Sequence, residues 1–117
     1  MRNSLIAVSL VLLPVLAGCG GASDESKIRD VIALGNKHDP KVCERVTDKW
    51  LKSVTGGGKE DCQRLVKQTG TAKFKVRKVT VKGDRATVDG SIRDKTGQLL
   101  LVKDGGDWKL DDARPGG

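Results

Sequence analysis

Large aromatic side chains are scarce in this sequence, which has two tryptophans, one phenylalanine and no tyrosine among 117 residues. A chain of this length forms one domain with a modest core. So few large side chains leave that core short of hydrophobic stabilisation. We therefore expect the domain to gain from a covalent cross-link.

Groups that carry catalysis are also scarce. The single histidine, His38, stands beside Asp39, and no serine or free cysteine is placed to act as a nucleophile. The pair could form a general base with its orienting partner. However, sequence neighbours on a loop seldom point toward each other, so we interpret His38 as a surface residue near a helix start. We expect a protein that is not an enzyme and holds no metal ion or cofactor.

No apolar run is long enough to cross a membrane. The stretch from Leu5 to Leu16 is interrupted only by Ser9 and Pro14. At about a dozen residues, it is shorter than the roughly 20 that a spanning helix needs. Together with the preceding Arg2, it is typical of a signal peptide.

The segment Leu16-Ala17-Gly18-Cys19 closes this run. It resembles the lipobox of bacterial lipoprotein signals, which implies cleavage before Cys19 and acylation of its thiol. Acyl chains contribute about 0.8 kcal/mol per buried methylene, so they anchor a protein durably. We expect a membrane partner through this anchor and a location on the extracytoplasmic face of the cell membrane. An ordinary secretory signal containing a cysteine is the alternative.

The chain is thereby divided into four parts. Residues 1–18 are predicted to be the lipoprotein signal peptide, and 19–26 the lipidated cysteine with a flexible tether of small and polar residues. Residues 27–113 are predicted to form an α+β domain. The remaining residues, 114–117, read as a disordered tail.

With Cys19 acylated, Cys43 and Cys62 remain in an oxidising compartment, where a disulfide is expected. A bridge that closes a loop of about 20 residues contributes about 3 kcal/mol by the chain-entropy model. A metal site is one alternative, but two isolated cysteines without a nearby histidine do not form one. Free thiols are the other alternative.

The first half of the domain has helical periodicity. A short helix is predicted to stop near Gly35-Asn36, and Asp39-Pro40 is typical of a helix start. One continuous amphipathic helix is then predicted from apolar residues at every fourth position, namely Val42, Val46, Trp50 and Val54. After a glycine run, a shorter helix is predicted to turn three residues inward: Cys62, Leu65 and Val66.

The second half has the period of strands. From Lys73 the apolar residues alternate, and their phase slips by one between Val76 and Val79, which predicts a bulge. Three further strands follow, with turns at 82–84, 94–97 and 104–107. The strand at 99–102 is apolar on both faces, so it should be central or covered on both sides. Helices followed by an antiparallel meander predict an α+β fold.

Two segments of the strand half carry a family resemblance. Segment 79–88 combines a strand, a Gly-Asp turn and an Ala-x-Val strand, and segment 105–110 ends in Trp-Lys-Leu. Both resemble small lipoproteins of the nuclear transport factor 2-like (cystatin-like cone) superfamily, especially actinobacterial members with paired helical cysteines. The resemblance implies that N-terminal helices pack into the concave face of a curved antiparallel sheet. The domain is short for this superfamily, so the cone should be shallow.

The net charge of +7 favours an anionic environment. An exported protein rarely meets nucleic acid, so we expect no nucleic-acid partner. The leading hypothesis is a non-catalytic binding or interaction module that meets another envelope protein or an anionic envelope polymer. Its candidate surface comprises Lys73, Lys75, Arg77, Arg85 and Arg93. Strand register decides whether the two basic rows adjoin, and the competing interpretation is a plain solvated outer face.

The alternative hypothesis is a carrier or accessory subunit for a small apolar ligand. Trp50, Phe74 and Trp108 would then line a pocket inside the cone, whereas the competing interpretation is that they fill the core. The apolar strand at 99–102 also suggests a homodimer that is formed through the outer sheet face.

Overall fold

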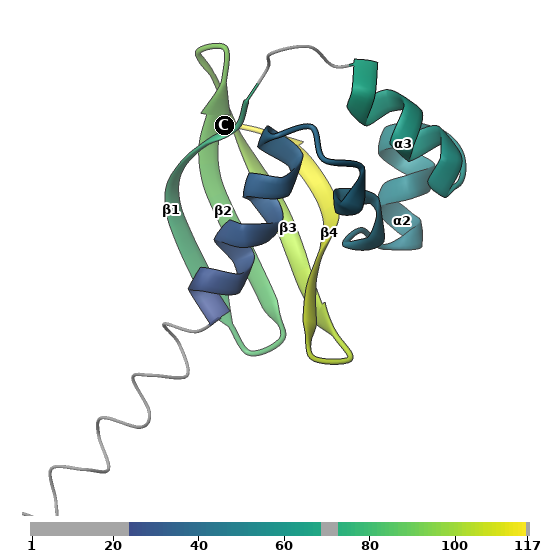
Figure 1. Ribbon diagram of the computed structural model, residues 1–117. Coiled ribbons are helices and arrows are strands. Elements are labelled where there is room, and N and C mark those ends of the chain that lie inside the picture. The colour runs from purple at the N-terminus through teal and green to yellow at the C-terminus, as the bar shows by residue number, and fades with distance from the viewer. Residues whose placement is uncertain (1–23, 69–72, 117) are drawn as a thin grey trace, which may run out of the picture.

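The computed structural model describes residues 24–68 and 73–116 of the chain (Figure 1). Helices form the first half and a four-stranded antiparallel sheet forms the second, so the predicted α+β class is confirmed. The strand order is β1-β2-β3-β4, a simple meander. The predicted signal peptide and Cys19 lie outside the described residues. Within the described residues, no helix has the length and apolar character to cross a membrane.

The sheet consists of β1 (Lys75–Lys82), β2 (Arg85–Ile92), β3 (Lys95–Asp104) and β4 (Asp107–Pro115). As predicted, the apolar strand β3 is central, because it pairs with both β2 and β4. The turn between β2 and β3 consists of Arg93 and Asp94, whose φ angles are 48° and 67°. Two successive positive φ angles give a turn that matches the twist of a hairpin. The predicted turn at 94–97 is therefore wrong, since β3 already begins at Lys95.

Two bulges bend the sheet. The register of β1 against β2 shifts between Val76 and Lys78, which confirms the bulge predicted from the phase slip. A second shift lies opposite Leu100 and Leu101 of β3 and leaves Asp111 of β4 without a cross-strand partner. The sequence did not indicate this second bulge.

The N-terminal helix (residues 24–36) lies across one face of the sheet, which we call the inner face (Figure 1). Ile28, Val31 and Ile32 are buried there together with Leu101 and Trp108. The helix ends where Gly35-Asn36 predicts it. Its first turn occupies residues 24–26, so the predicted flexible tether is wrong at those positions.

The single amphipathic helix predicted after Pro40 is wrong. The segment instead forms a 3₁₀ helix η1 (Pro40–Glu44), a single turn α2 (Asp48–Trp50) and a π-helical turn η2 (Leu51–Thr55). Val46 interrupts the helix because it pairs with Leu110 in a parallel bridge. The N–H of Thr47 donates to the Leu110 carbonyl at 2.9 Å, and the Leu110 N–H donates to the Arg45 carbonyl at 2.8 Å. Pairing with β4 therefore replaces one turn of helix.

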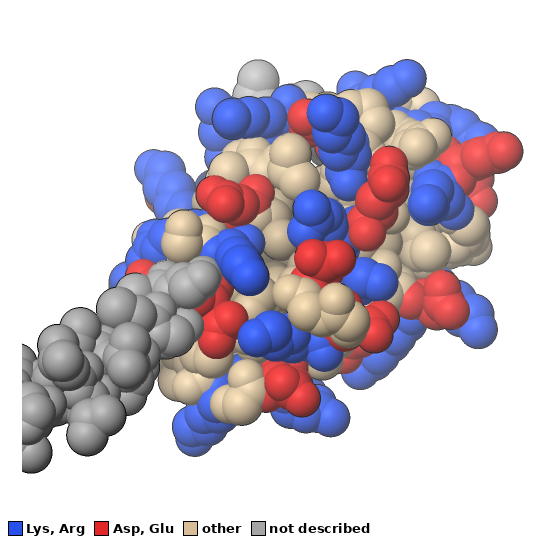
Figure 2. Space-filling model, turned by 60° about the horizontal axis from the view of Figure 1, so that its bottom comes forward, with Lys and Arg blue, Asp and Glu red and all other residues tan. Residues whose placement is uncertain are grey.

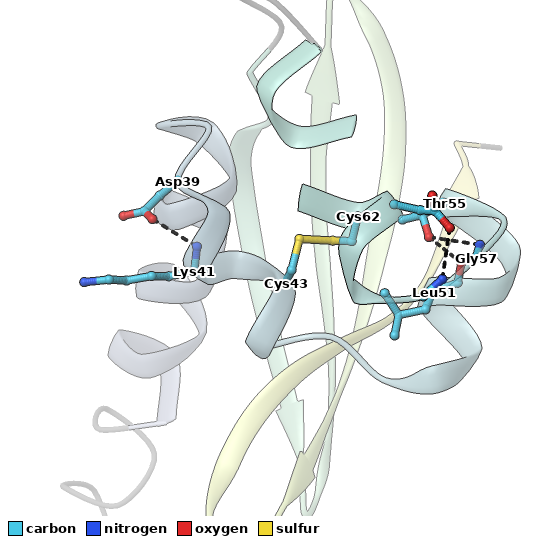
Figure 3. The surroundings of a disulfide bond; sticks show 9 residues. Asp39, Lys41, Cys43, Leu51, Thr55, Gly57 and Cys62 are labelled. Atoms are coloured by element: carbon cyan, nitrogen blue, oxygen red, sulfur yellow. Dashed lines mark hydrogen bonds between the residues drawn. A yellow bond between two sulfur atoms is a disulfide. The ribbon is translucent and has the colours of Figure 1, made fainter. Parts of the chain in front are cut away.

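A disulfide joins Cys43 of η1 to Cys62 of α3 (Lys59–Gln68), with an S–S distance of 2.06 Å (Figure 3). Both cysteines are buried in the core. The bridge holds α3 against η1 across 19 residues of sequence. It therefore fixes a helix that otherwise packs at the margin of the sheet.

The C-terminal end is more ordered than the sequence predicts. Arg114 and Pro115 belong to β4 and pair with Gln98 and Gly97 of β3. The Gly116 N–H then donates to the Thr96 carbonyl at 2.9 Å. The prediction of a disordered tail from residue 114 is therefore wrong for these residues, because backbone pairing with the central strand continues to this point.

Candidate functional site

The helices leave part of the inner sheet face uncovered at the end where β2 turns into β3. A hollow of about 270 Å³ lies between this end of the sheet and the segment from α2 to α3. We call it the apolar groove, because none of the described residues that line it is Asp, Glu, Lys or Arg. Its main apolar lining residues are Trp50, Val54, Leu65, Val66, Phe74 and Ile92.

The exposed large hydrophobic side chains of the described residues cluster in this groove. Val54 and Ile92 are each 41% exposed and Leu65 is 37% exposed, and all three line the hollow. Single exposed hydrophobic residues are ordinary on protein surfaces, whereas clustered ones mark interaction or ligand sites. The cluster therefore identifies this end of the sheet as the candidate functional site.

Phe74 is held in the groove from two sides. The Asn36 side chain, at the end of the N-terminal helix, donates to the Phe74 carbonyl at 2.9 Å and accepts from the Phe74 N–H at 2.8 Å. On the other side, a Cβ on Gly90 of β2 would lie only 2.6 Å from the Phe74 ring. Glycine at position 90 thus makes room for the ring, and Asn36 fixes the backbone that carries it.

Trp50 is positioned by the bulge in β4. The Thr47 hydroxyl donates to the carboxylate of the bulged residue Asp111 at 2.8 Å. The same hydroxyl accepts from the Trp50 N–H at 3.2 Å and caps α2. The bulge that the sequence did not indicate is therefore linked through Thr47 to the backbone of Trp50.

Trp108 lies elsewhere, although the carrier hypothesis groups it with Trp50 and Phe74. It is 1% exposed under the N-terminal helix. Its indole N–H donates to the Asp24 carboxylate at 3.2 Å, and the Lys103 ammonium donates to the same oxygen at 3.3 Å. The hydrogen bond from Trp108 is the largest cause that lowers the pKa of Asp24, and the hydrogen bond from Lys103 lowers it further. Partial burial of the carboxylate opposes this shift. Trp108 is thus a core residue at the opposite end of the molecule.

The predicted basic surface is split by strand register. Lys75 lies opposite Ser91, whereas Arg85 lies opposite Lys82 at the other end of β1 and β2. Lys73, Lys75 and Arg77 therefore share one end of the sheet with Arg93 of the β2–β3 turn, and Arg85 is separate from them. The opposite end of the sheet lies where the N-terminal helix begins at Asp24. It carries basic and acidic side chains side by side (Figure 2).

The described residues contain no group of three or more His, Cys, Asp or Glu side chains that could hold a metal ion. His38 lines the apolar groove. The neighbouring Asp39 carboxylate accepts from the Lys41 N–H at 3.0 Å and caps η1 (Figure 3). Asp39 thus has a structural role at a helix start, as its sequence position indicates.

For two groove residues, the sequence pattern predicted a buried environment that the structure does not show. The apolar periodicity placed Val54 and Leu65 on inward faces, where they would be covered. Leu65 is instead exposed on α3 at the rim of the groove. Periodicity identifies which face of an element is apolar, but it does not show whether another element covers that face.

No protein-family model matches the chain, and no curated protein gives a significant match to its sequence. The resemblance to the cone superfamily therefore stays a prediction. Function is inferred from the groove itself.

Proposed function

We propose that this protein is a membrane-anchored extracytoplasmic lipoprotein, and that it is a non-catalytic binding module that holds a small apolar ligand in the apolar groove. The anchor on Cys19 and the shallow cone fold belong to this proposal. It is carried by one observation: Val54, Leu65 and Ile92 line a single hollow with Trp50 and Phe74. Covering such side chains contributes about 25 cal/mol per Å² of apolar surface.

The walls of the groove support a preformed site. The disulfide fixes α3, the Asn36 side chain fixes Phe74, and the Thr47 cap fixes the start of the turn that carries Trp50. Small-molecule sites are concave, mostly apolar and largely preformed, with volumes of about 300–1,000 Å³. The hollow of about 270 Å³ lies just below that range. A ligand with a single alkyl chain or ring fits this size better than a bulky one.

Thermal unfolding with an added apolar ligand tests the proposal. The full chain carrying Cys19→Ser, which removes the acylated thiol, is heated with and without tetradecanol. A ligand present at 100 times its Kd adds about 2.7 kcal/mol to the unfolding free energy. For a domain of this size, that corresponds to a Tm increase on the order of 10 °C.

The matched variants are Ile92→Ser in the groove and Leu100→Ser on the outer face. Leu100 is partly exposed like the groove residues, but it precedes the buried Leu101 in β3 and so points to the other face. Ile92→Ser should reduce the ligand-induced Tm increase, and Leu100→Ser should preserve it. Equal responses of the two variants would place the ligand outside the groove.

A second candidate function is binding of an anionic envelope polymer. Lys73, Lys75 and Arg77 are exposed along the start of the edge strand β1, which favours this candidate. Binding of this kind weakens as salt screens the charges. Pull-down with isolated cell wall at low and high salt, using the protein and a Lys73→Ala/Lys75→Ala/Arg77→Ala variant, tests it. Salt-independent binding, or equal binding by the variant, would exclude it.

A further inference from the structure

A second hollow of about 400 Å³ adjoins the apolar groove, and the two share Phe74 and Ile92. Leu99, Ala113 and Pro115 contribute to its lining. The apolar surface therefore extends from α2 and α3 across the inner face to the last residues of β4. A ligand that filled both hollows would reach the turn between β2 and β3.

This second hollow differs from the groove in its charge. Arg93 and Lys95 line it, and among residues 24–68 and 73–116 no Asp or Glu lines either hollow. Asp94, between them in the turn, is not among the lining residues. Arg114 also lines the hollow, but it interacts electrostatically with Asp112. Two cations, Arg93 and Lys95, thus border an apolar surface that Asp94 does not line.

The backbone explains how apolar and cationic groups meet here. Lys95 pairs with Ile92 in the β2–β3 register, so both side chains start from the same face of the sheet. Arg93 is brought to the same edge by its positive φ of 48° in the turn. In the part of the chain that the structure describes, neither Arg93 nor Lys95 forms an ion pair.

The other end of the sheet shows the contrast. There Lys103 pairs with Asp24 at 3.3 Å, and Lys109 pairs with Asp104 at the same distance. Lys103 and Lys109 at that end are therefore matched by protein carboxylates. At the groove end, the positive charge of Arg93 and Lys95 is available to a ligand.

We infer that the ligand is an amphiphile with an apolar chain and an anionic head, the chain lying along Phe74 and Ile92 and the head binding Arg93 and Lys95. This inference rests on the proposed function and adds the chemical class of the ligand. An uncharged apolar ligand would leave the two cations unused, and a small anion would leave the groove empty. A carboxylate or a phosphate head has the required chemistry.

Isothermal titration calorimetry of the full Cys19→Ser chain tests the inference with three probes that share a 14-carbon chain. Tetradecanoate carries a carboxylate, a lysophosphatidylglycerol with the same chain carries a phosphate, and tetradecanol carries no charge. Hydrogen bonds to charged groups are worth about 1.5–3 kcal/mol. The anionic probes should therefore bind about 10- to 100-fold more tightly than tetradecanol. The carboxylate and phosphate probes distinguish a fatty acid from a lipid as the source.

Two double variants locate the head group. Arg93→Ala/Lys95→Ala should bring the anionic probes to the affinity of tetradecanol. Lys82→Ala/Arg85→Ala removes the same charge from the other end of β1 and β2, so it should preserve the difference.

Each other result has a definite meaning. Equal wild-type affinity for tetradecanol and for both anionic probes would overturn the inference and keep the apolar groove as the binding site. Equal losses in the two double variants would also overturn it, because net charge alone would then explain the preference. Absence of binding by all three probes would overturn the proposed function as well.

Discussion

The two ends of the sheet are built differently. At the Asp24 end, a buried indole, a carboxylate and an ammonium form one hydrogen-bonded cluster, and Trp108 is covered by the N-terminal helix. At the groove end, Val54, Leu65 and Ile92 are exposed, and Arg93 and Lys95 form no ion pair with a described residue. From this comparison we expect the Asp24 end to contribute more to stability, whereas the groove end keeps apolar surface uncovered.

Removing the two tryptophans in turn should show the largest difference between the ends. Trp108→Ala deletes a buried side chain, and such changes cost about 3–5 kcal/mol. Trp50→Ala affects a partly exposed groove residue, for which we expect a loss of about 1 kcal/mol. Urea unfolding of both variants measures the two values. Equal losses would contradict the division into a stabilising end and a binding end.

Removing the disulfide should affect the groove more than the Asp24 end. Replacing Cys43 and Cys62 together by alanine should lower the unfolding free energy by about 3 kcal/mol. Hydrogen exchange would then measure which amides lose protection. We expect early loss in α3, which the bridge holds, and retention in β3, which is central. Uniform loss across both elements would show that the bridge stabilises the whole domain alike.

Gly90→Ala tests the packing under Phe74. The added Cβ would lie 2.2 Å from the Lys75 carbonyl oxygen and 2.6 Å from the Phe74 ring. Overpacking of this kind costs about 1–3 kcal/mol. Gly58→Ala is the matched control, because a Cβ there meets nothing within 4 Å. Thermal unfolding should show a loss for Gly90→Ala alone, and an equal Tm for the two variants would mean that the ring moves freely.

The smallest predicted effect is the pH dependence that arises at Asp24. The pKa of this carboxyl is lowered below its ordinary 3.8 in the folded protein, mainly by the Trp108 hydrogen bond. Its contribution to stability is therefore present above that ordinary value and is lost as pH falls through the lower, folded pKa. The stability difference between the protein and Asp24→Asn should shrink on acidification below about pH 4. A constant difference from pH 6 to pH 2.5 would contradict this assignment.

Local patterns in the sequence predicted much of the fold. The phase slip between Val76 and Val79 predicted the β1 bulge, because strand periodicity is a local property. The cysteine count and the expected compartment predicted the pairing of Cys43 with Cys62. The apolar strand at 99–102 predicted a central position. Each of these predictions depended on residues close together in the sequence or on the cysteine content of the whole chain.

Features set by distant partners were not predictable in this way. Val46 has helical spacing with Trp50, but its pairing with Leu110 interrupts the helix. The groove depends on the absence of cover over Ile92 and Leu65, which no pattern within one element reveals. Arg93 and Lys95 become part of the site only because the turn brings them beside the same hollow.

If the proposed anchor on Cys19 holds, the contact between Asp24 and the β3–β4 end would orient the whole molecule. Under the proposed anchor, Cys19 stands five residues before Asp24, and an extended chain of that length reaches about 17 Å. The Asp24 end must then stay close to the bilayer, while the β2–β3 turn and the hollows it borders face outward (Figure 1). In this orientation, the two hollows would open away from the membrane that holds the anchor. The protein would then exchange its ligand with a neighbouring envelope layer or a partner protein more readily than with the lipids of its own membrane.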